Sequence, residues 1–398
     1  MANVSSSNGL EKRPKLRFPG FDEPYKQCRI GDIYAERSQR GASNMELLSV
    51  TMNDGVMPRS EIEGKDNSSE DKSNYKIVRK GDMVYNSMRM WQGANGISPC
   101  DGIVSPAYTV LMPKQEINNG YFAALFKSTN LINEFRKNSQ GMTSDTWNLK
   151  YPQIETIKVR IPSVSEQDKV SELFSIFDER IAAQAQLVES LKKYKRGVIC
   201  KVFSEIENEY NIIRFGDCVS IFRGGSPRPI DDYITDDPSG INWIKIGDTS
   251  ADELYITRTK EKIISAGAKK SRRVYHGDLI LSNSMSFGRP YILQIDGCIH
   301  DGWLLIRDEE NIFEKRFLCY YLGSDNVIAQ YKRFAAGSCV NNLNSELVGN
   351  VKICCPPRAV QQKIADMLTI LDLHIDHASH TCEAFQRIRT SLLQQLFM

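Results

Sequence analysis

The sequence lacks long apolar runs and CxxC cysteine pairs. No stretch of its 398 residues approaches the apolar length of a membrane span, which needs about eighteen residues or more. The polar start MANVSSSNGLEKRP is not a signal peptide. The ten cysteines are scattered with no CxxC pair, a distribution that favours reduced thiols over disulfides. We therefore expect a cytoplasmic protein with no membrane partner.

The chain also has little net charge, only +2. Residues 1–160 carry 22 Lys and Arg against 18 Asp and Glu, and residues 205–353 carry 18 against 21. Neither half is a polycation of the kind that coats nucleic acid by charge alone. A DNA-binding role would therefore require local clusters of basic residues and a partner that supplies further phosphate contacts.

Recognisable catalytic motifs are missing as well. There is no Walker A loop, HExxH helix or GxSxG elbow. Adenine methylation would require an Asn/Asp-Pro-Pro-aromatic motif, whereas the Pro-Pro pair at 356–357 is flanked by Cys and Arg. His374, His377 and His380, near Cys382, are spaced i, i+3, i+6, which spreads them over about 120° of a helix instead of pairing them at i, i+4. We expect no catalysis, no metal site and no cofactor.

What the sequence does contain is an internal repeat at a shift of about 194 residues. The stretch 162–170 matches 356–364 without a gap. Further upstream the shift drifts by a few residues, as loops of different length would cause. The matched positions include Ile176, Asp178, Ile181 and Phe203 with Ile370, Asp372, Ile375 and Phe397, Asn148-Leu149 with Asn342-Leu343, Lys80-Gly81-Asp82 with His276-Gly277-Asp278, and Arg29-Ile30-Gly31-Asp32 with Arg214-Phe215-Gly216-Asp217.

Each copy begins with about 140 residues of short β-branched runs separated by Gly, Pro, Asn and Asp. The runs 241–248, 277–284 and 155–162 predict strands. One helix is predicted in each copy, at about 120–137 and 314–334.

The second part of each copy, about 40 residues, has a heptad-like apolar stripe, which predicts a long helix. The predicted domains are two globular domains and two helical spacers, at residues 1–160, 161–204, 205–355 and 356–398.

A helix of about 38 residues is roughly 57 Å long and cannot bury its stripe on a compact domain of 140 residues. The simplest partner is the other long helix, and two like copies related by an approximate twofold axis pair their helices antiparallel. For a DNA reader this geometry suits two half-sites separated by one or more helical turns of roughly 34 Å. Because the two globular domains differ in sequence, an asymmetric bipartite target is expected. A plain oligomerisation element is the alternative for the helices alone.

At this point the chain resembles the specificity subunits of type I restriction–modification enzymes over essentially its whole length. The resemblance is carried by residues 14–21 (PKLRFPGF), the repeated Gly-Asp pairs, 221–227 (IFRGGSP), 242–248 (NWIKIGD) and the two Gln-x-Lys helix starts. It implies an α+β chain with two similar mixed α/β target-recognition domains and two long helices packed as an antiparallel coiled coil. It also implies double-stranded DNA, two methyltransferase subunits and restriction/translocase subunits as partners.

The segments that would contact DNA are polar or basic loops in each domain. The first domain lacks the Gly-Gly-Ser-Pro turn of the second and has a longer, more acidic loop at 53–74. The candidate DNA-binding residues are Arg37, Arg40, Asn86, Arg89, Gln92, Thr143, Arg223, Ser226, Arg228, Lys245, Lys269, Lys270, Arg272, Arg273, Asn283, Ser284, Ser286, Arg289, Asn341 and Asn342.

Two other functions stay open on the sequence. One is a coiled-coil scaffold whose two globular domains bind proteins. The other is the specificity half of a single-chain restriction–methylation enzyme. Sequence preference in DNA binding would separate the first of these from a specificity subunit.

Overall fold

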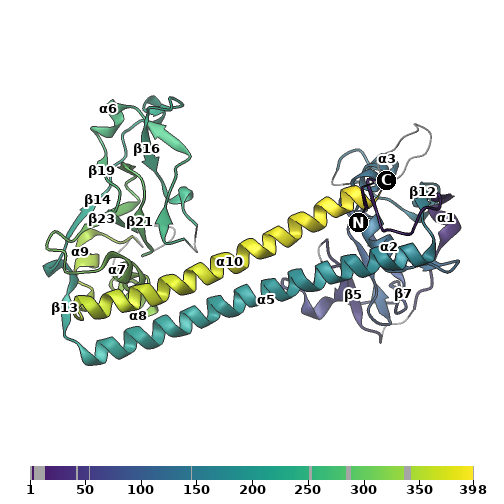
Figure 1. Cartoon of the computed structure of the whole chain (residues 1–398), viewed down its shortest axis with the longest axis horizontal. Helices are drawn as coiled ribbons and strands as arrows, with labels where there is room; N and C mark the ends of the chain where they lie inside the picture. Colours follow the sequence, from purple (N-terminus) through teal and green to yellow (C-terminus); the bar gives the residue numbers. More distant parts are fainter. Residues whose placement is uncertain are drawn as a thin grey trace. The chain divides into compact units, whose positions relative to one another are not determined.

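The computed structural model describes residues 2–3, 14–41, 44–52, 54–144, 146–250, 253–283, 288–335 and 342–397. The chain divides into two compact units (Figure 1). Unit 1 comprises Met1–Gln186 and Ser379–Met398, and unit 2 comprises Leu187–Ala378. None of the described helices is long and apolar enough to cross a membrane.

The globular part of unit 1, here called the first head, is built on two four-stranded sheets. Their strand orders are β6-β5-β10-β7 and β4-β11-β8-β9, and β3 and β12 form a separate antiparallel pair. The strands are β1 (Ala2–Asn3), β2 (Leu16–Arg17), β3 (Lys26–Arg29), β4 (Tyr34–Glu36), β5 (Leu47–Val50), β6 (Val56–Pro58), β7 (Lys76–Val78), β8 (Met83–Asn86), β9 (Asn95–Ile97), β10 (Gly102–Val104), β11 (Tyr108–Pro113) and β12 (Lys158–Ile161).

The globular part of unit 2, here called the second head, has two five-stranded sheets. Their orders are β14-β23-β20-β21-β17 and β15-β18-β16-β22-β19, with β13 paired to β24. The strands are β13 (Ile212–Arg214), β14 (Ser220–Arg223), β15 (Ile234–Thr235), β16 (Ile241–Ile244), β17 (Tyr255–Ile256), β18 (Glu261–Ile263), β19 (Arg272–Val274), β20 (Leu279–Ser282), β21 (Pro290–Leu293), β22 (Gly297–Ile299), β23 (Trp303–Arg307) and β24 (Lys352–Cys354).

The prediction of one helix per head was wrong, because each of those stretches folds as two helices. In the first head α2 stops before Ser128, whose side chain accepts a hydrogen bond from the Leu131 N–H and starts α3. In the second head Gly323 ends α7, and α8 begins at Asp325. The short helices are α1 (Ile30–Ile33), α2 (Asn119–Leu125), α3 (Thr129–Asn138), α4 (Tyr151–Ile154), α6 (Ser265–Ala268), α7 (Lys315–Leu322), α8 (Asp325–Ala335) and α9 (Ser345–Gly349).

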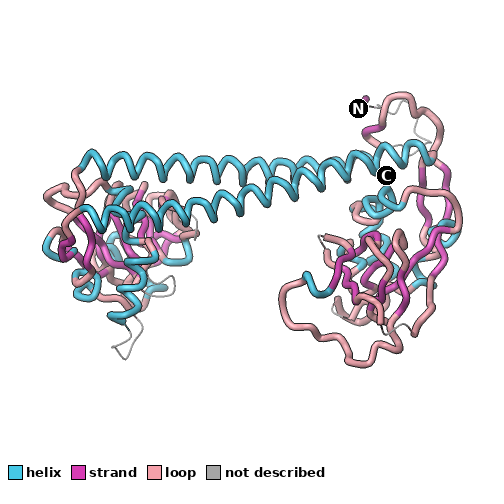
Figure 2. The backbone as a smooth tube through the Cα atoms, turned by 90° about the horizontal axis from the view of Figure 1, so that it is seen from below, coloured by secondary structure: helices cyan, strands magenta, loops and turns pink. Residues whose placement is uncertain are grey.

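The two long helices are α5 (Val164–Glu209, 46 residues) and α10 (Arg358–Leu396, 39 residues), and each is continuous (Figure 2). In unit 1 the Phe177 and Phe385 rings lie 6.5 Å apart, and Phe174 stacks on Phe397 at 5.8 Å. The earlier residue of α5, Phe174, therefore contacts the later residue, Phe397, just beyond the end of α10, so the two helices run antiparallel. The fold class is as predicted: two similar α/β heads, with two long helices packed against each other.

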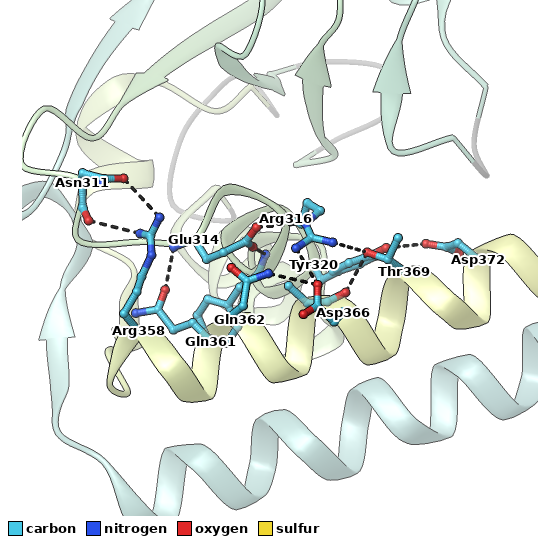
Figure 3. Close-up of polar contacts among 12 residues, drawn as sticks. Asn311, Glu314, Arg316, Tyr320, Arg358, Gln361, Gln362, Asp366, Thr369 and Asp372 are labelled. Carbon is cyan, nitrogen blue, oxygen red and sulfur yellow. Dashed lines mark hydrogen bonds and ion pairs between the residues drawn. The ribbon is translucent and has the colours of Figure 1, made fainter.

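The repeat explains how each long helix is anchored at its start. Gln361 is 1% exposed. Its Oε1 accepts a hydrogen bond from the Glu314 N–H at 2.7 Å (Figure 3). Its Nε2 donates to Pro356 O at 2.8 Å. In unit 1 the equivalent Gln167 accepts from the Asn118 N–H (3.0 Å) and donates to Pro162 O (3.1 Å). The glutamine of each Gln-x-Lys start thus ties its long helix to the residue that precedes a short helix of the same head. These residues are Asn118 before α2 and Glu314 before α7.

A second repeated contact joins the long helices within each unit. In unit 1 Arg389 of α10 forms two hydrogen bonds with Asp178 of α5. In unit 2 Lys195 of α5 pairs with Asp372 of α10. The shift of 194 residues carries Asp178 onto Asp372 and Lys195 onto Arg389, so the same pair recurs with its two helices exchanged.

Candidate nucleic-acid interface

The Gly-Gly-Ser-Pro-Arg segment of the second head leaves β14 and lies tightly against the turn between β22 and β23. The Gly224 N–H donates to Trp303 O at 2.8 Å, and the Gly225 N–H donates to Ile299 O at 3.2 Å. A Cβ on Gly224 would lie 2.1 Å from His300 O, so the chain passes where only glycine fits. The residues 224–228 are called the glycine loop below.

Asp301 is the polar hub of this region. One carboxylate oxygen accepts a hydrogen bond from the Ser226 hydroxyl (2.9 Å), and the other accepts one from Arg228 Nη2 (3.3 Å). The Asp301 N–H returns a bond to the Ser226 oxygen at 3.2 Å. His300 Nε2 lies 2.9 Å from Asp301 Oδ1, and His300 Nδ1 accepts from the Gly302 N–H.

Electrostatics keep the Asp301 carboxyl ionised. Burial raises its pKa, but the Ser226 hydrogen bond, His300 and Arg228 outweigh burial and leave the pKa below its ordinary value. The Arg228 side chain is 82% exposed whereas Asp301 is 28% exposed. The guanidinium is therefore held at one end and open to solvent, or to a phosphate, at the other.

The predicted basic cluster at 269–273 lies next to the glycine loop. Arg272 Nε donates to Arg223 O at 3.2 Å, and its guanidinium lies 5.2 Å from the Phe222 ring centroid. Lys270 pairs with the Tyr233 hydroxyl and lies 4.8 Å from that ring centroid. We call the exposed cations of this region the basic face; it comprises Arg223, Arg228, Lys269, Lys270, Arg272 and Arg273.

Other candidates of the second head have different surroundings. Asn283 is 3% exposed and its amide donates to Asp301 O at 2.8 Å, so it supports the turn from below. Lys245 is paired with Glu261. Arg289 lines a cavity of about 400 Å³ together with Lys195 of α5. Asn342 is exposed, while Ser284, Ser286 and Asn341 lie outside the described residues.

In the first head the stretch that holds Asn86, Arg89 and Gln92 lies close to the stretch that follows Thr143. The Trp91 ring, within 86–93, lies 5.2 Å from that of Trp147, and Arg136 lies 5.6 Å from the Trp91 ring. The Leu149 N–H donates to Ser87 O at 2.8 Å. Of the candidates in these two segments, Arg89 and Thr143 are exposed, and Asn86 and Gln92 are half-buried.

Arg37 and Arg40 differ in how free they are. Arg37 donates two hydrogen bonds to Asp82 of the Gly-Asp turn, at 2.8 and 3.2 Å, and is 23% exposed. This carboxylate raises the pKa of Arg37 and occupies its guanidinium. Arg40 is exposed.

Among the described residues no group of His, Cys, Asp and Glu side chains is arranged to hold a metal ion. The nine described cysteines are all free thiols.

The sequence analysis missed Asp301 and Tyr233, which position the cations of the basic face. A lone aspartate in a His-Asp-Gly turn resembles any surface turn, and the 75 residues between Ser226 and Asp301 hide their contact. Their proximity could have been inferred only if the pairing of β14 with β23 had been known.

Comparisons with known proteins agree with this architecture. The family model "Type I restriction modification DNA specificity domain" matches residues 23–193 and again 207–381. The type I restriction enzyme MjaVIII specificity subunit of Methanocaldococcus jannaschii is 21% identical over 352 residues, covering 80% of this chain and 79% of that protein. The putative MjaX specificity subunit of the same organism is 20% identical over 297 residues, covering 69% and 66%.

Solved structures show the same fold. The type I restriction–modification S subunit from M. genitalium is 16% identical with a TM-score of 0.58, over 97% of this chain and 99% of that one. A chain from a structure of type I restriction–modification complex assembly is 16% identical with a TM-score of 0.63, over 95% and 98%. Since the family model covers most of the sequence in two successive copies, this chain belongs to the type I restriction–modification DNA specificity family and carries two specificity domains.

Proposed function

We propose that each head reads one half of an asymmetric bipartite DNA target and that the chain presents this DNA to two methyltransferase subunits and to restriction/translocase subunits. In this proposal the chain performs no catalysis itself and works in the cytoplasm. The doubled family match supports two recognition modules. The domain bounds that we propose are residues 1–160 and 205–355 for the heads, with 161–204 and 356–398 as spacers.

The observation that carries the proposal is the basic face. Residues 205–353 carry more acids than bases overall, yet six exposed cations lie in two neighbouring segments, 223–228 and 269–273. DNA affinity depends on such local neutralisation of phosphates, and not on net charge alone. The glycine loop places the Ser226 hydroxyl and the Arg228 guanidinium close together, and both kinds of group contact phosphates and base edges.

The first head supports an asymmetric target because its equivalent surface is built differently. Its long 53–74 loop is held by Arg59, which donates to the carbonyls of Ile62 (2.6 Å), Gly64 (3.1 Å) and Lys65 (2.7 Å). The proposed DNA-contacting residues there are Arg40, Asn86, Arg89, Gln92 and Thr143, with Arg37 held by Asp82.

Exposed apolar residues on the long helices support two equivalent protein partners. Ile176 is 51% exposed and Ile370, its equivalent in the repeat, is 53% exposed. Tyr194 is 61% exposed and its equivalent Ile388 is 48% exposed. Large apolar side chains repeated at equivalent exposed positions suit two copies of one partner, which we take to be the methyltransferase subunit.

A binding assay with the full chain and the methyltransferase subunit tests DNA reading. A duplex selected from a random library should show two specified halves and bind more tightly than a scrambled duplex of equal length. Arg272→Ala should weaken binding to both and make the slope of log K against log salt shallower by about 0.9. Lys363→Ala, which removes an exposed cation from α10, is the matched control. Absence of any sequence preference would leave the protein-binding scaffold as the better interpretation.

Exchange of residues 1–160 for those of a relative tests modularity. One half of the selected target should change and the other should stay. A change in both halves would contradict separate reading by the two heads.

Partner stoichiometry is a separate test. Ile176→Asp and Ile370→Asp should each remove one bound methyltransferase copy, and the double variant should remove both, as measured by native mass spectrometry. Glu179→Ala, an exposed polar change on α5, is the control. Loss of both copies in either single variant would contradict two equivalent sites.

A further inference from the structure

An acid, Asp301, lies beside Arg228, one of the cations of the basic face, and its charge opposes the binding of phosphate. Asp301 lies within hydrogen-bond distance of Ser226 and Arg228, two of the proposed DNA-contacting residues. A carboxylate here repels phosphate and occupies a cation that could otherwise neutralise one. The backbone bonds of Gly224 and Gly225 hold the start of the loop without the Asp301 carboxylate.

We propose that Asp301 is the positioning residue that sets the specificity of the second head. It holds Arg228 in an internal ion pair until a cognate sequence offers the guanidinium a better partner, and it keeps the Ser226 hydroxyl oriented towards the glycine loop. This inference rests on the proposed function, since it assigns a role within the DNA-reading surface.

The geometry supports a restraint that can be released. Arg228 reaches the carboxylate through one nitrogen at 3.3 Å, and its side chain is otherwise exposed, so the ion pair is weak and open to competition. Asp301 itself is fixed from three sides. Ser226 and its own N–H share a reciprocal pair of bonds, Asn283 holds its carbonyl, and His300 contacts its carboxylate.

At the positions equivalent to this turn, the sequence of the first head has no acid. The strands β22 and β23 correspond to β10 and β11, so the His300-Asp301-Gly302 turn falls on Ser105-Pro106-Ala107. An effect of Asp301 should therefore be confined to the half-site read by the second head.

The energetic consequence is opposite for random and cognate DNA. On a scrambled duplex, Asp301→Asn frees Arg228 to neutralise one more phosphate. One additional contact makes the log–log salt slope steeper by about 0.9, which corresponds to about eightfold tighter binding at 0.1 M salt. On the selected duplex Arg228 is already engaged with DNA, so affinity stays the same or falls because Ser226 loses its anchor.

The experiment measures binding of the full chain with the methyltransferase subunit to the selected and the scrambled duplex at several salt concentrations. Asp301→Asn should bind the scrambled duplex about fivefold to tenfold more tightly, with the steeper slope, and lose about fivefold or more in discrimination. Bases should become degenerate only in one half of a newly selected target. Asp296→Asn, at the other end of β22, makes the same change of charge and should leave discrimination unchanged.

A second variant tests the same inference without touching the turn. Arg228→Gln should weaken binding to the selected duplex, where Arg228 has exchanged Asp301 for its cognate partner, with little change on the scrambled duplex. The Arg228→Gln/Asp301→Asn double variant should lose the tighter binding of scrambled DNA. These outcomes require that Asp301 acts through Arg228.

The inference is overturned if Asp301→Asn leaves the slope of log K against log salt unchanged on the scrambled duplex, while the wild type prefers the selected duplex to the scrambled one. It is also overturned if Asp296→Asn gives the same gain, or if Arg228→Gln weakens both duplexes equally. A wild type that shows no preference between the duplexes refutes the proposed function, and the role of Asp301 with it. The two failures are therefore distinguished by the wild-type measurement alone.

Discussion

The buried ion pair between Arg17 and Glu166 should be the most sensitive polar contact of unit 1. Arg17 Nε and Nη2 donate to the two carboxylate oxygens at 2.9 and 2.8 Å, and the Tyr25 hydroxyl donates to Oε1 at 3.1 Å. Arg17 is 6% exposed and Glu166 is 1% exposed. The hydrogen bond to Glu166 raises the pKa of Arg17, so the guanidinium stays charged inside the protein.

The expected cost follows from the isolation of the remaining charge. Arg17→Met leaves a carboxylate buried with a tyrosine hydroxyl as its partner, and breaking a buried pair in this way costs about 3–5 kcal/mol. In a unit of about 200 residues this lowers the melting temperature by roughly 6 °C or more. Removing both partners should cost far less, because a well-packed apolar pair often replaces a buried ion pair without loss.

The repeat supplies the replacement for Glu166. The equivalent position in unit 2 is Val360, at the same place in the first turns of α10. We therefore combine Arg17→Met with Glu166→Val, and add Tyr25→Phe to remove the unpaired hydroxyl. The free energy of unfolding of this triple variant should lie within about 1–2 kcal/mol of the wild-type value. Hydrogen exchange of peptides from residues 164–186 measures the change, and peptides from unit 2 provide an internal control. This reasoning would be refuted if Arg17→Met lowered the free energy of unfolding by less than about 1 kcal/mol. It would also be refuted if the losses of the single substitutions simply added up in the triple variant.

Three further predictions concern stability and reactivity. Gln361→Ala leaves the Glu314 N–H and Pro356 O without their partner and should cost about 1–3 kcal/mol in urea unfolding, whereas exposed Gln362→Ala should change little (Figure 3). Asp372→Ala removes the ion-pair partner of Lys195 and the acceptor to which the Tyr320 hydroxyl donates at 2.6 Å, and it should cost about 1–3 kcal/mol. The more exposed Asp178→Ala should cost less than about 1 kcal/mol, and equal costs would contradict this ranking. Burial raises the pKa of Cys354 to about 11 and shields its thiol, so alkylation at pH 8 followed by mass spectrometry should modify exposed Cys200 first and Cys354 last.

The sequence predicted the large features because they are periodic or repeated. The heptad stripe located both long helices, and the repeat related their partners. The predicted strands at 155–162, 241–248 and 277–284 contain β12, β16 and β20. Errors arose where a single residue ends an element, as at Ser128 and Gly323, since apolar periodicity continues across both breaks.

The candidate site was less accessible to sequence reasoning. The glycine loop and the cluster 269–273 could be recognised from composition, and the structure places them side by side. The partners that hold them come from distant parts of the chain: Tyr233 for Lys270 and Asp301 for Ser226. Asn283 was expected to face DNA, yet its short amide is turned inward to Asp301, and a strand pattern does not reveal which way a residue at the end of the strand points.

The repeat separates contacts that maintain the fold from contacts that belong to one head, and this leads to a sharp test by head duplication. The glutamine anchors and the Asp178–Arg389 and Asp372–Lys195 pairs recur in both units, whereas Arg17–Glu166 occurs once and crosses the boundary between head and helix.

Replacing residues 1–160 by residues 205–354 therefore brings no partner for Glu166. The duplicated chain should lose about 3–5 kcal/mol in unit 1 and recover most of it with Glu166→Val. Calorimetry of the two duplicated chains and the wild type measures this difference. If the duplicated chain that keeps Glu166 is as stable as the one that carries the Glu166→Val substitution, the glutamine anchors alone determine how a head joins its helix, and the ion pair has no part in it.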